Sequence, residues 1–167
     1  AGGELPYLLW CLVFYSVSIG GNGNTLALAL DMLLFSKSQR YKTMAKMSFV
    51  HCLFNINEPM MFGLPVILNP FLFIPFVLSP SVSAAAAWLM SSLHIVSKID
   101  FMISVSMPWT TPHPVTAFFA GGITYSIYIL VLILINAVLY FPFYIAMDRK
   151  ELEQEKAAEM EAGHAVL

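Results

Sequence analysis

The sequence predicts an all-α, polytopic membrane protein with about three transmembrane helices, a proline-rich re-entrant hairpin and an interfacial amphipathic helix. Hydrophobic residues make up 59% of the 167 residues, and the mean hydropathy is +0.76. Charged residues make up only 11%, against about 25% in a soluble domain. Residues 5–30 and 101–147 contain no Asp, Glu, Lys or Arg, and each exceeds the ~20 apolar residues that cross a bilayer.

The first expected span covers residues 7–35. The run Gly20–Asn24 interrupts it, and irregular backbone at membrane depth needs neighbouring groups that satisfy its freed polar atoms. In residues 36–48, Tyr41, Met44 and Ala45 recur at helical spacing among basic residues. This pattern is typical of a short helix on a membrane surface.

Five prolines then follow one another at short intervals, at positions 59, 65, 70, 75 and 80. Each proline removes a backbone donor and clashes with the preceding helical turn, so a straight helix is excluded. We expect a re-entrant or broken segment beside a water-filled lumen, continued by a kinked span over residues 71–93.

Residues 94–114 are expected to form a loop, because closely spaced prolines interrupt regular structure. Residues 117–147 form the third expected span, which is longer than a perpendicular crossing needs, so either it breaks at Gly121-Gly122 or the helix tilts. Asp148 and Glu151 have the spacing of a capping box, which would start a solvated tail helix running to about Ala162.

The chain therefore divides into a membrane domain, residues 1–147, and a charged tail, residues 148–167. Basic residues gather in two clusters that the positive-inside rule assigns to the cytoplasm, together with the C-terminus; they are Lys37, Arg40, Lys42, Lys46, Arg149 and Lys150. The chain starts at Ala1 without the features of a signal peptide, so we expect a piece of a longer permease. The net charge of −2 is too small to indicate a nucleic-acid partner.

Glu58 is the leading candidate for a functional residue. It lies in Asn55-Ile-Asn-Glu-Pro59, at the start of a charge-free stretch that reaches Ser97. A carboxylate beside so much apolar sequence is costly unless it lines a polar cavity. Asn55 and Asn57 would then bind sugar hydroxyls with it, and Glu58 would orient or deprotonate one hydroxyl. The alternative is a carboxylate that only caps the helix starting at Pro59.

Trp109 and Thr110 form the second candidate group, in the run Met107-Pro-Trp-Thr-Thr-Pro112. The indole could stack on a pyranose ring while Thr110 binds hydroxyls, or it could be an interfacial aromatic residue. His113 could bind ligand or be structural. His51 and Cys52 lack a third ligand at useful spacing, so we predict no metal site and no cofactor.

The segment Phe54–Pro70 resembles the signature of the membrane-embedded IIC component of lactose/cellobiose-type sugar phosphotransferase systems. The likeness covers nearly the whole chain and corresponds to the C-terminal part of such a permease. It extends to Ile19–Leu28, Ser36–Ser38, Met107–Pro112, and Leu139–Tyr144 followed by Asp148.

The resemblance implies a dimeric permease that is embedded in the lipid of the bacterial inner membrane. Such a permease binds a disaccharide and moves it inward. A separate IIB protein, phosphorylated through IIA, would phosphorylate the sugar, and no residue of this chain is expected to carry the phosphoryl group itself. Whether the chain counts as an enzyme is therefore left open. In the family the glutamate corresponding to Glu58 lies near the hydroxyl that is phosphorylated, and the residues corresponding to Asn57 and Trp109 hold the sugar.

Two other functions remain open from the sequence. One is an ion-coupled secondary transporter in which Glu58 cycles a proton. The other is a truncated, non-transporting fragment that docks on a complete permease. The sequence does not identify the disaccharide.

Overall fold

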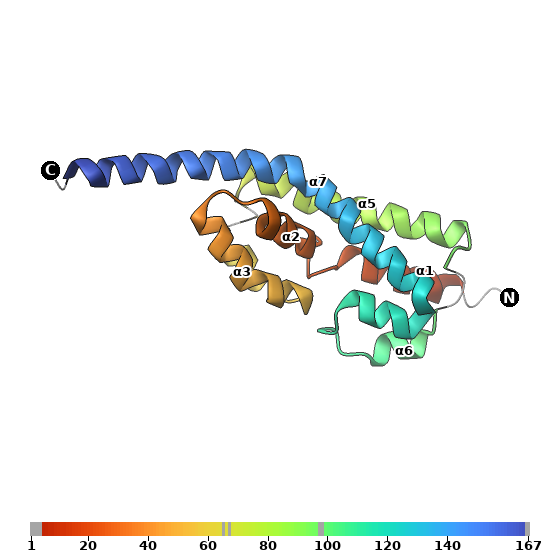
Figure 1. Ribbon diagram of the computed structural model, residues 1–167. Coiled ribbons are helices and arrows are strands. Elements are labelled where there is room, and N and C mark those ends of the chain that lie inside the picture. Colours follow the sequence, from red (N-terminus) through yellow and green to blue (C-terminus); the bar gives the residue numbers. More distant parts are fainter. Residues whose placement is uncertain (1–4, 65, 67, 97–98, 166–167) are drawn as a thin grey trace.

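The computed structural model describes residues 5–64, 66, 68–96 and 99–165, and within these ranges every regular element is a helix. Figure 1 shows their arrangement. The elements are α1 (Leu5–Val17), α2 (Thr25–Phe35), α3 (Gln39–Leu53), α4 (Glu58–Gly63), α5 (Pro70–Ser92), α6 (Phe101–Ser106) and α7 (His113–Ala165). The predicted all-α fold is confirmed. Pro65 and Lys98 lie outside the described residues.

The long helix α7 organises the fold. It extends along the molecule and projects beyond the other helices at its C-terminal end (Figure 1). Helix α5 packs against both α7 and α1, while α2 packs against α3 and α7. Tyrosines 125, 140 and 144 of α7 are fully buried at these contacts, so this helix supplies much of the core.

Two described helices, α5 and α7, are long and apolar enough to cross a membrane. The break expected at Gly20–Asn24 within residues 7–35 is confirmed, because α1 and α2 are separate helices on either side of it. The chain turns between them at Gly20, Gly21 and Gly23, whose φ angles are 75°, 95° and 77°. Glycine adopts such angles without a Cβ penalty.

Side-chain hydrogen bonds hold this glycine-rich turn against α5 and α7. The Asn24 amide donates to Ser83 Oγ at 2.9 Å, and the Asn136 amide donates to the same oxygen at 2.9 Å. Tyr140 donates its hydroxyl proton to the Gly23 carbonyl at 2.6 Å. Buried polar groups that are satisfied in this way make the turn a rigid part of the core.

The proline-rich segment is broken as expected. Pro59 lies in the first turn of α4 and Pro70 in the first turn of α5, where the missing N–H leaves no bond unmade. Pro75 and Pro80 lie inside α5. The helix that forms the expected span over residues 71–93 therefore begins at one proline and contains two more.

The expected loop over residues 94–114 contains a short helix, α6. Asp100 caps it by accepting a hydrogen bond from the Ile103 N–H at 3.0 Å. The prolines that argued against regular structure all come after this helix. The candidate break at Gly121-Gly122 is confirmed, because Gly122 has φ 74° and ψ −167° inside α7.

No new helix starts at Asp148, so the predicted capping box is wrong: α7 continues without interruption to Ala165. Asp148 is buried and reaches sideways to the chain before α3. It accepts hydrogen bonds from Ser36 Oγ at 2.9 Å, from the Lys37 N–H at 3.0 Å and from the Ser38 N–H at 3.2 Å. A helix interior therefore occupies the place where we expected a helix start.

Glu151 and Glu155 continue this contact along the same face of α7. Glu155 accepts from Ser38 Oγ at 2.8 Å and from the Arg40 N–H at 3.0 Å, while Glu151 pairs with Arg40 at 2.8 Å. The donors around Glu155, the Arg40 N–H first and then the Ser38 hydroxyl, hold its pKa below the usual value. We call Asp148, Glu151 and Glu155 the carboxylate clamp. The expectation of a solvated tail is wrong for Asp148, which is buried, and for Glu151 and Glu155, which face the chain around the start of α3, and it agrees with the exposed residues 153, 154 and 156–161.

Candidate functional site

Residues from separate segments surround a hollow of about 240 Å³. They come from α1, the glycine-rich turn, the turn before α4, the loop after α6 and the start of α7. The lining residues are Phe14, Ser18, Gly21, Asn22, Asn55, Asn57, Glu58, Trp109 and His113. Four residues predicted from the sequence, Asn55, Asn57, Glu58 and Trp109, therefore face one space.

Asn55 connects three segments around the hollow. It has a φ of 64°, a left-handed conformation that asparagine tolerates better than most residues. Its carbonyl oxygen accepts from the Gly20 N–H at 3.1 Å, and its amide nitrogen donates to the carbonyls of Trp109 and Thr111 at 2.9 and 2.8 Å. The side-chain amide is thus engaged in holding the walls in place.

Asn57 packs directly on the glycine-rich turn. Its amide nitrogen donates to the Asn22 carbonyl at 2.9 Å. A Cβ atom on Gly21 would lie 2.6 Å from Asn57 Cγ, and Gly21 has φ +95°. Glycine is therefore required at 21 both by the backbone angle and by the space that Asn57 occupies.

Glu58 begins α4 and is exposed at the hollow. Within the described ranges no hydrogen bond or ion pair occupies its carboxylate. At the first turn of a helix the unpaired backbone N–H groups favour a negative charge, although α4 is short. The carboxylate is thus both ionisable and available to a ligand.

Trp109 lies across the hollow in an exposed loop, with 65% of its surface accessible. Such an indole offers a face to a ligand at low conformational cost. Thr110, which we predicted as a neighbouring ligand, is partly buried and is not among the lining residues. His113 lines the hollow and is only 4% exposed, with its ring packed edge-on against Tyr15 at 5.0 Å.

The sequence interpretation missed four lining residues: Phe14, Ser18, Gly21 and Asn22. A signal for the last two was present, because a glycine-rich break inside apolar sequence survives at membrane depth only where it is buried in protein or borders a wet cavity. Phe14 and Ser18 are four residues apart, near the end of α1, and nothing in the apolar sequence around them distinguishes this face of the helix.

The chain is similar to proteins of known family. Residues 10–80 match the family model described as phosphotransferase system, EIIC. The chain is 38% identical over 160 residues to the galactose-specific EIIC component of the PTS system of Lactococcus lactis subsp. cremoris, covering 95% of this chain and 35% of that protein. It is 36% identical to the oligo-beta-mannoside-specific EIIC component of Bacillus subtilis, covering 93% of this chain and 35% of that protein.

A solved structure is also similar. It is the crystal structure of the transporter ChbC, the IIC component from the N,N'-diacetylchitobiose-specific phosphotransferase system, with a TM-score of 0.79 and 33% identity. The match covers 86% of this chain and 34% of that one. The chain thus spans about a third of the length of the relatives it matches.

Proposed function

Because this chain belongs to the EIIC family of phosphotransferase systems, we propose that it supplies the C-terminal part of a sugar permease. The permease binds a disaccharide of the cellobiose, chitobiose or lactose type and presents it to a IIB partner, which receives its phosphoryl group from IIA. One observation carries this proposal: Asn57 and Glu58, at the start of α4, line one hollow with Trp109 from the distant loop after α6.

The side chains suit distinct roles in holding a sugar. Glu58 orients the acceptor hydroxyl and draws its proton, since its carboxylate is unoccupied within the described ranges. Asn57 binds further hydroxyls, and Trp109 stacks on a ring. Asn55, whose amide already makes three hydrogen bonds, acts as a positioning residue. Thr110, next to Trp109 but outside the hollow, supports the position of the Trp109 loop and does not contact the sugar.

The size of the hollow fits part of a disaccharide. Its volume of about 240 Å³ is below the ~300–1,000 Å³ of typical ligand pockets. One sugar ring would occupy it, and the rest of the permease would close the site over the second ring. The same assembly would be a homodimer in the bacterial inner membrane, embedded in lipid, with the C-terminal end of α7 in the cytoplasm.

The proposal is tested by the energy source of uptake. Membrane vesicles that contain the complete permease should accumulate phosphorylated disaccharide when supplied with phosphoenolpyruvate, the IIA and IIB proteins and the sugar. Collapse of the proton gradient should leave this uptake unchanged, because the phosphoryl group supplies the driving force.

Two results would contradict the proposal. Uptake that stops with the proton gradient but continues without IIB would favour an ion-coupled secondary transporter. Membrane insertion without sugar binding or uptake would favour a non-transporting fragment.

Gly21→Ala in the complete permease should raise the KM for sugar at least tenfold. The new Cβ would meet Asn57 Cγ at 2.6 Å, so the Asn57 amide must leave its position. A displacement of about 1 Å in a group that positions the substrate is enough for a large loss of catalytic efficiency. The measurement is the initial rate of IIB-dependent phosphorylation against sugar concentration.

The double variant Gly21→Ala/Asn57→Ala separates this effect from general strain. If the glycine change acts partly through Asn57, the double variant should lose less than the sum of the two single variants, although the backbone angle and the Cβ of residue 57, 2.9 Å from the new Cβ, keep part of the loss. Fully additive losses would show that Gly21 acts through the backbone and not through the sugar contact.

A further inference from the structure

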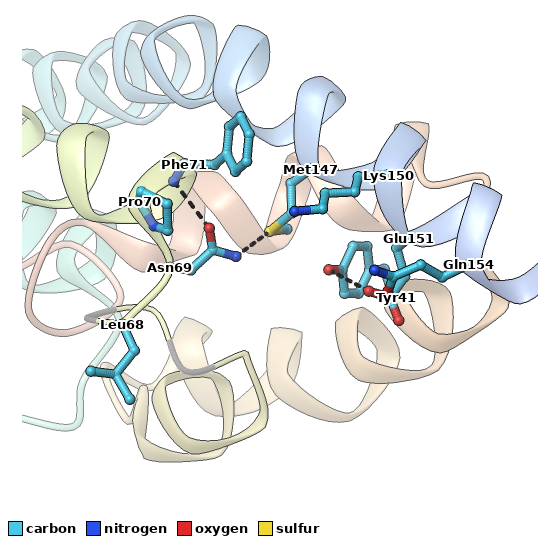
Figure 2. A pocket seen from close by; sticks show the side chains of 9 residues that line it. All are labelled: Tyr41, Leu68, Asn69, Pro70, Phe71, Met147, Lys150, Glu151 and Gln154. Atoms are coloured by element: carbon cyan, nitrogen blue, oxygen red, sulfur yellow. Dashed lines mark hydrogen bonds between the residues drawn. The ribbon is translucent and has the colours of Figure 1, made fainter.

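A second hollow lies far along α7 from the Glu58 hollow, where α7 passes the N-terminal ends of α3 and α5 (Figure 2). Its volume is about 320 Å³. Polar side chains from three segments face it: Tyr41 of α3, Asn69 before α5, and Lys150, Glu151 and Gln154 of α7.

An apolar groove adjoins this polar hollow. The groove has a volume of about 450 Å³ and shares Pro70 and Phe71 with the hollow. It continues between α5 and α7 along Ile74, Phe143 and Ala146. The two spaces lie side by side with Pro70 and Phe71 as shared walls, and we refer to them together as the cleft, with a polar end and an apolar end.

The polar end carries an uncompensated positive charge. Glu151 is already paired, since its oxygens accept from Arg40 Nη1 at 2.8 Å and from the Tyr41 hydroxyl at 3.1 Å. Burial, and then the Glu151 carboxylate, raise the pKa of Tyr41, so its hydroxyl stays protonated and donates. Within the described ranges Lys150 has no such partner. The polar end therefore favours an anion.

The position of the cleft along α7 matches the boundary of a bilayer. Residues 101–147 contain no charged side chain, so the groove beside Phe143 and Ala146 lies at hydrocarbon depth. Charges begin at Asp148, which puts Lys150 at headgroup level. A ligand that fills both ends must be amphipathic, with its anionic group about one helical turn above its apolar part.

We propose that this cleft binds one anionic phospholipid. Lys150 and Gln154 hold the phosphate, and one acyl chain lies in the groove between α5 and α7. The occupant is a lipid and not a soluble phosphate because the apolar groove lies next to the polar hollow and shares Pro70 and Phe71 with it. This cleft is separate from the hollow beside Glu58. The lipid proposal therefore does not depend on whether that hollow binds sugar.

The test uses the complete permease, purified and stripped of lipid, with palmitoyl-oleoyl phosphatidylglycerol and phosphatidylcholine as probes. Native mass spectrometry gives the dissociation constant of the first bound lipid. Wild-type protein should prefer phosphatidylglycerol, and Lys150→Ala should weaken its binding about fivefold, the effect of one basic residue at a membrane surface. Arg149→Ala is the matched control: it removes the same charge from an exposed neighbour that does not line the cleft.

A second variant tests the apolar end. Ala146→Phe fills the groove and should weaken binding of both lipids while leaving IIB-dependent phosphorylation measurable. Equal affinity of wild-type protein for the two lipids would overturn the proposal, as would equal losses in Arg149→Ala and Lys150→Ala. A change of oligomeric state in Ala146→Phe without a change in lipid affinity would show that protein covers the cleft, and would also overturn it.

Discussion

Glu58→Gln in the complete permease should lower kcat for IIB-dependent sugar phosphorylation by about 10²–10⁴-fold, the usual contribution of a positioned general base. The glutamine keeps the size and hydrogen-bonding reach of the side chain but cannot accept the hydroxyl proton. The KM should change much less, because the amide still contacts the sugar. The measurement is the rate of sugar phosphate formation at saturating sugar and saturating phosphorylated IIB.

The thermal midpoint of Glu58→Gln should match that of wild-type protein, since no hydrogen bond or ion pair in the described ranges depends on this carboxylate. Glu153→Gln is the matched control, because Glu153 is an exposed glutamate of α7 outside both hollows. It should retain full activity. Wild-type rates in Glu58→Gln would remove this residue from the mechanism.

Asp148→Ala should loosen the chain before α3 from α7, although Glu151 and Glu155 still hold Ser38, Arg40 and Tyr41, and should cost about 3 kcal/mol or more in stability. The buried carboxylate accepts from Ser36 Oγ and from the backbone N–H groups of Lys37 and Ser38. Each buried donor that loses its acceptor costs about 1–3 kcal/mol. The measurement is hydrogen exchange, which should accelerate at the amides of Lys37 and Ser38 before the rest of the protein.

Asp148→Asn keeps one side-chain oxygen as an acceptor and should lose less than half as much stability. Arg149→Ala, at the exposed neighbouring position, should stay within about 0.5 kcal/mol of wild type. Unchanged protection of Lys37 and Ser38 in Asp148→Ala would show that these amides find other acceptors. Asp148 would then not be needed to hold the chain before α3 against α7.

The hydropathy pattern and the prolines were enough to predict helices, a span over residues 71–93 that the structure has as Pro70–Ser92, and a break at Gly121-Gly122. These features depend on the dihedral limits of single residues, which are local. The pairing of Asp148 with Ser36–Ser38 is a contact between distant segments, and no local rule distinguishes it from a helix cap. That is why the sequence predicted a helix start where α7 has a buried side chain.

The same distinction applies to the site. Asn57, Glu58 and Trp109 could be predicted as polar or aromatic groups that apolar surroundings do not otherwise explain. Asn55 belongs to the same motif, but only the fold reveals that its amide holds Gly20, Trp109 and Thr111 together. The wall formed by Phe14 and Ser18 depends on how α1 packs, which residue types alone do not specify.

The hydrogen bonds among Asn24, Ser79, Ser83 and Asn136 limit which substitutions these positions can accept during evolution. Each of these side chains satisfies another, and a partly satisfied buried network is worse than an apolar one. Replacement of Asn136 by leucine would leave the Ser79 hydroxyl without its acceptor and would remove one of the two amide donors to Ser83 Oγ, while the bond from Asn24 to Ser83 would remain. We therefore expect correlated substitutions at these four positions among related permeases. All four residues should be polar or all four apolar, and mixed combinations should be rare.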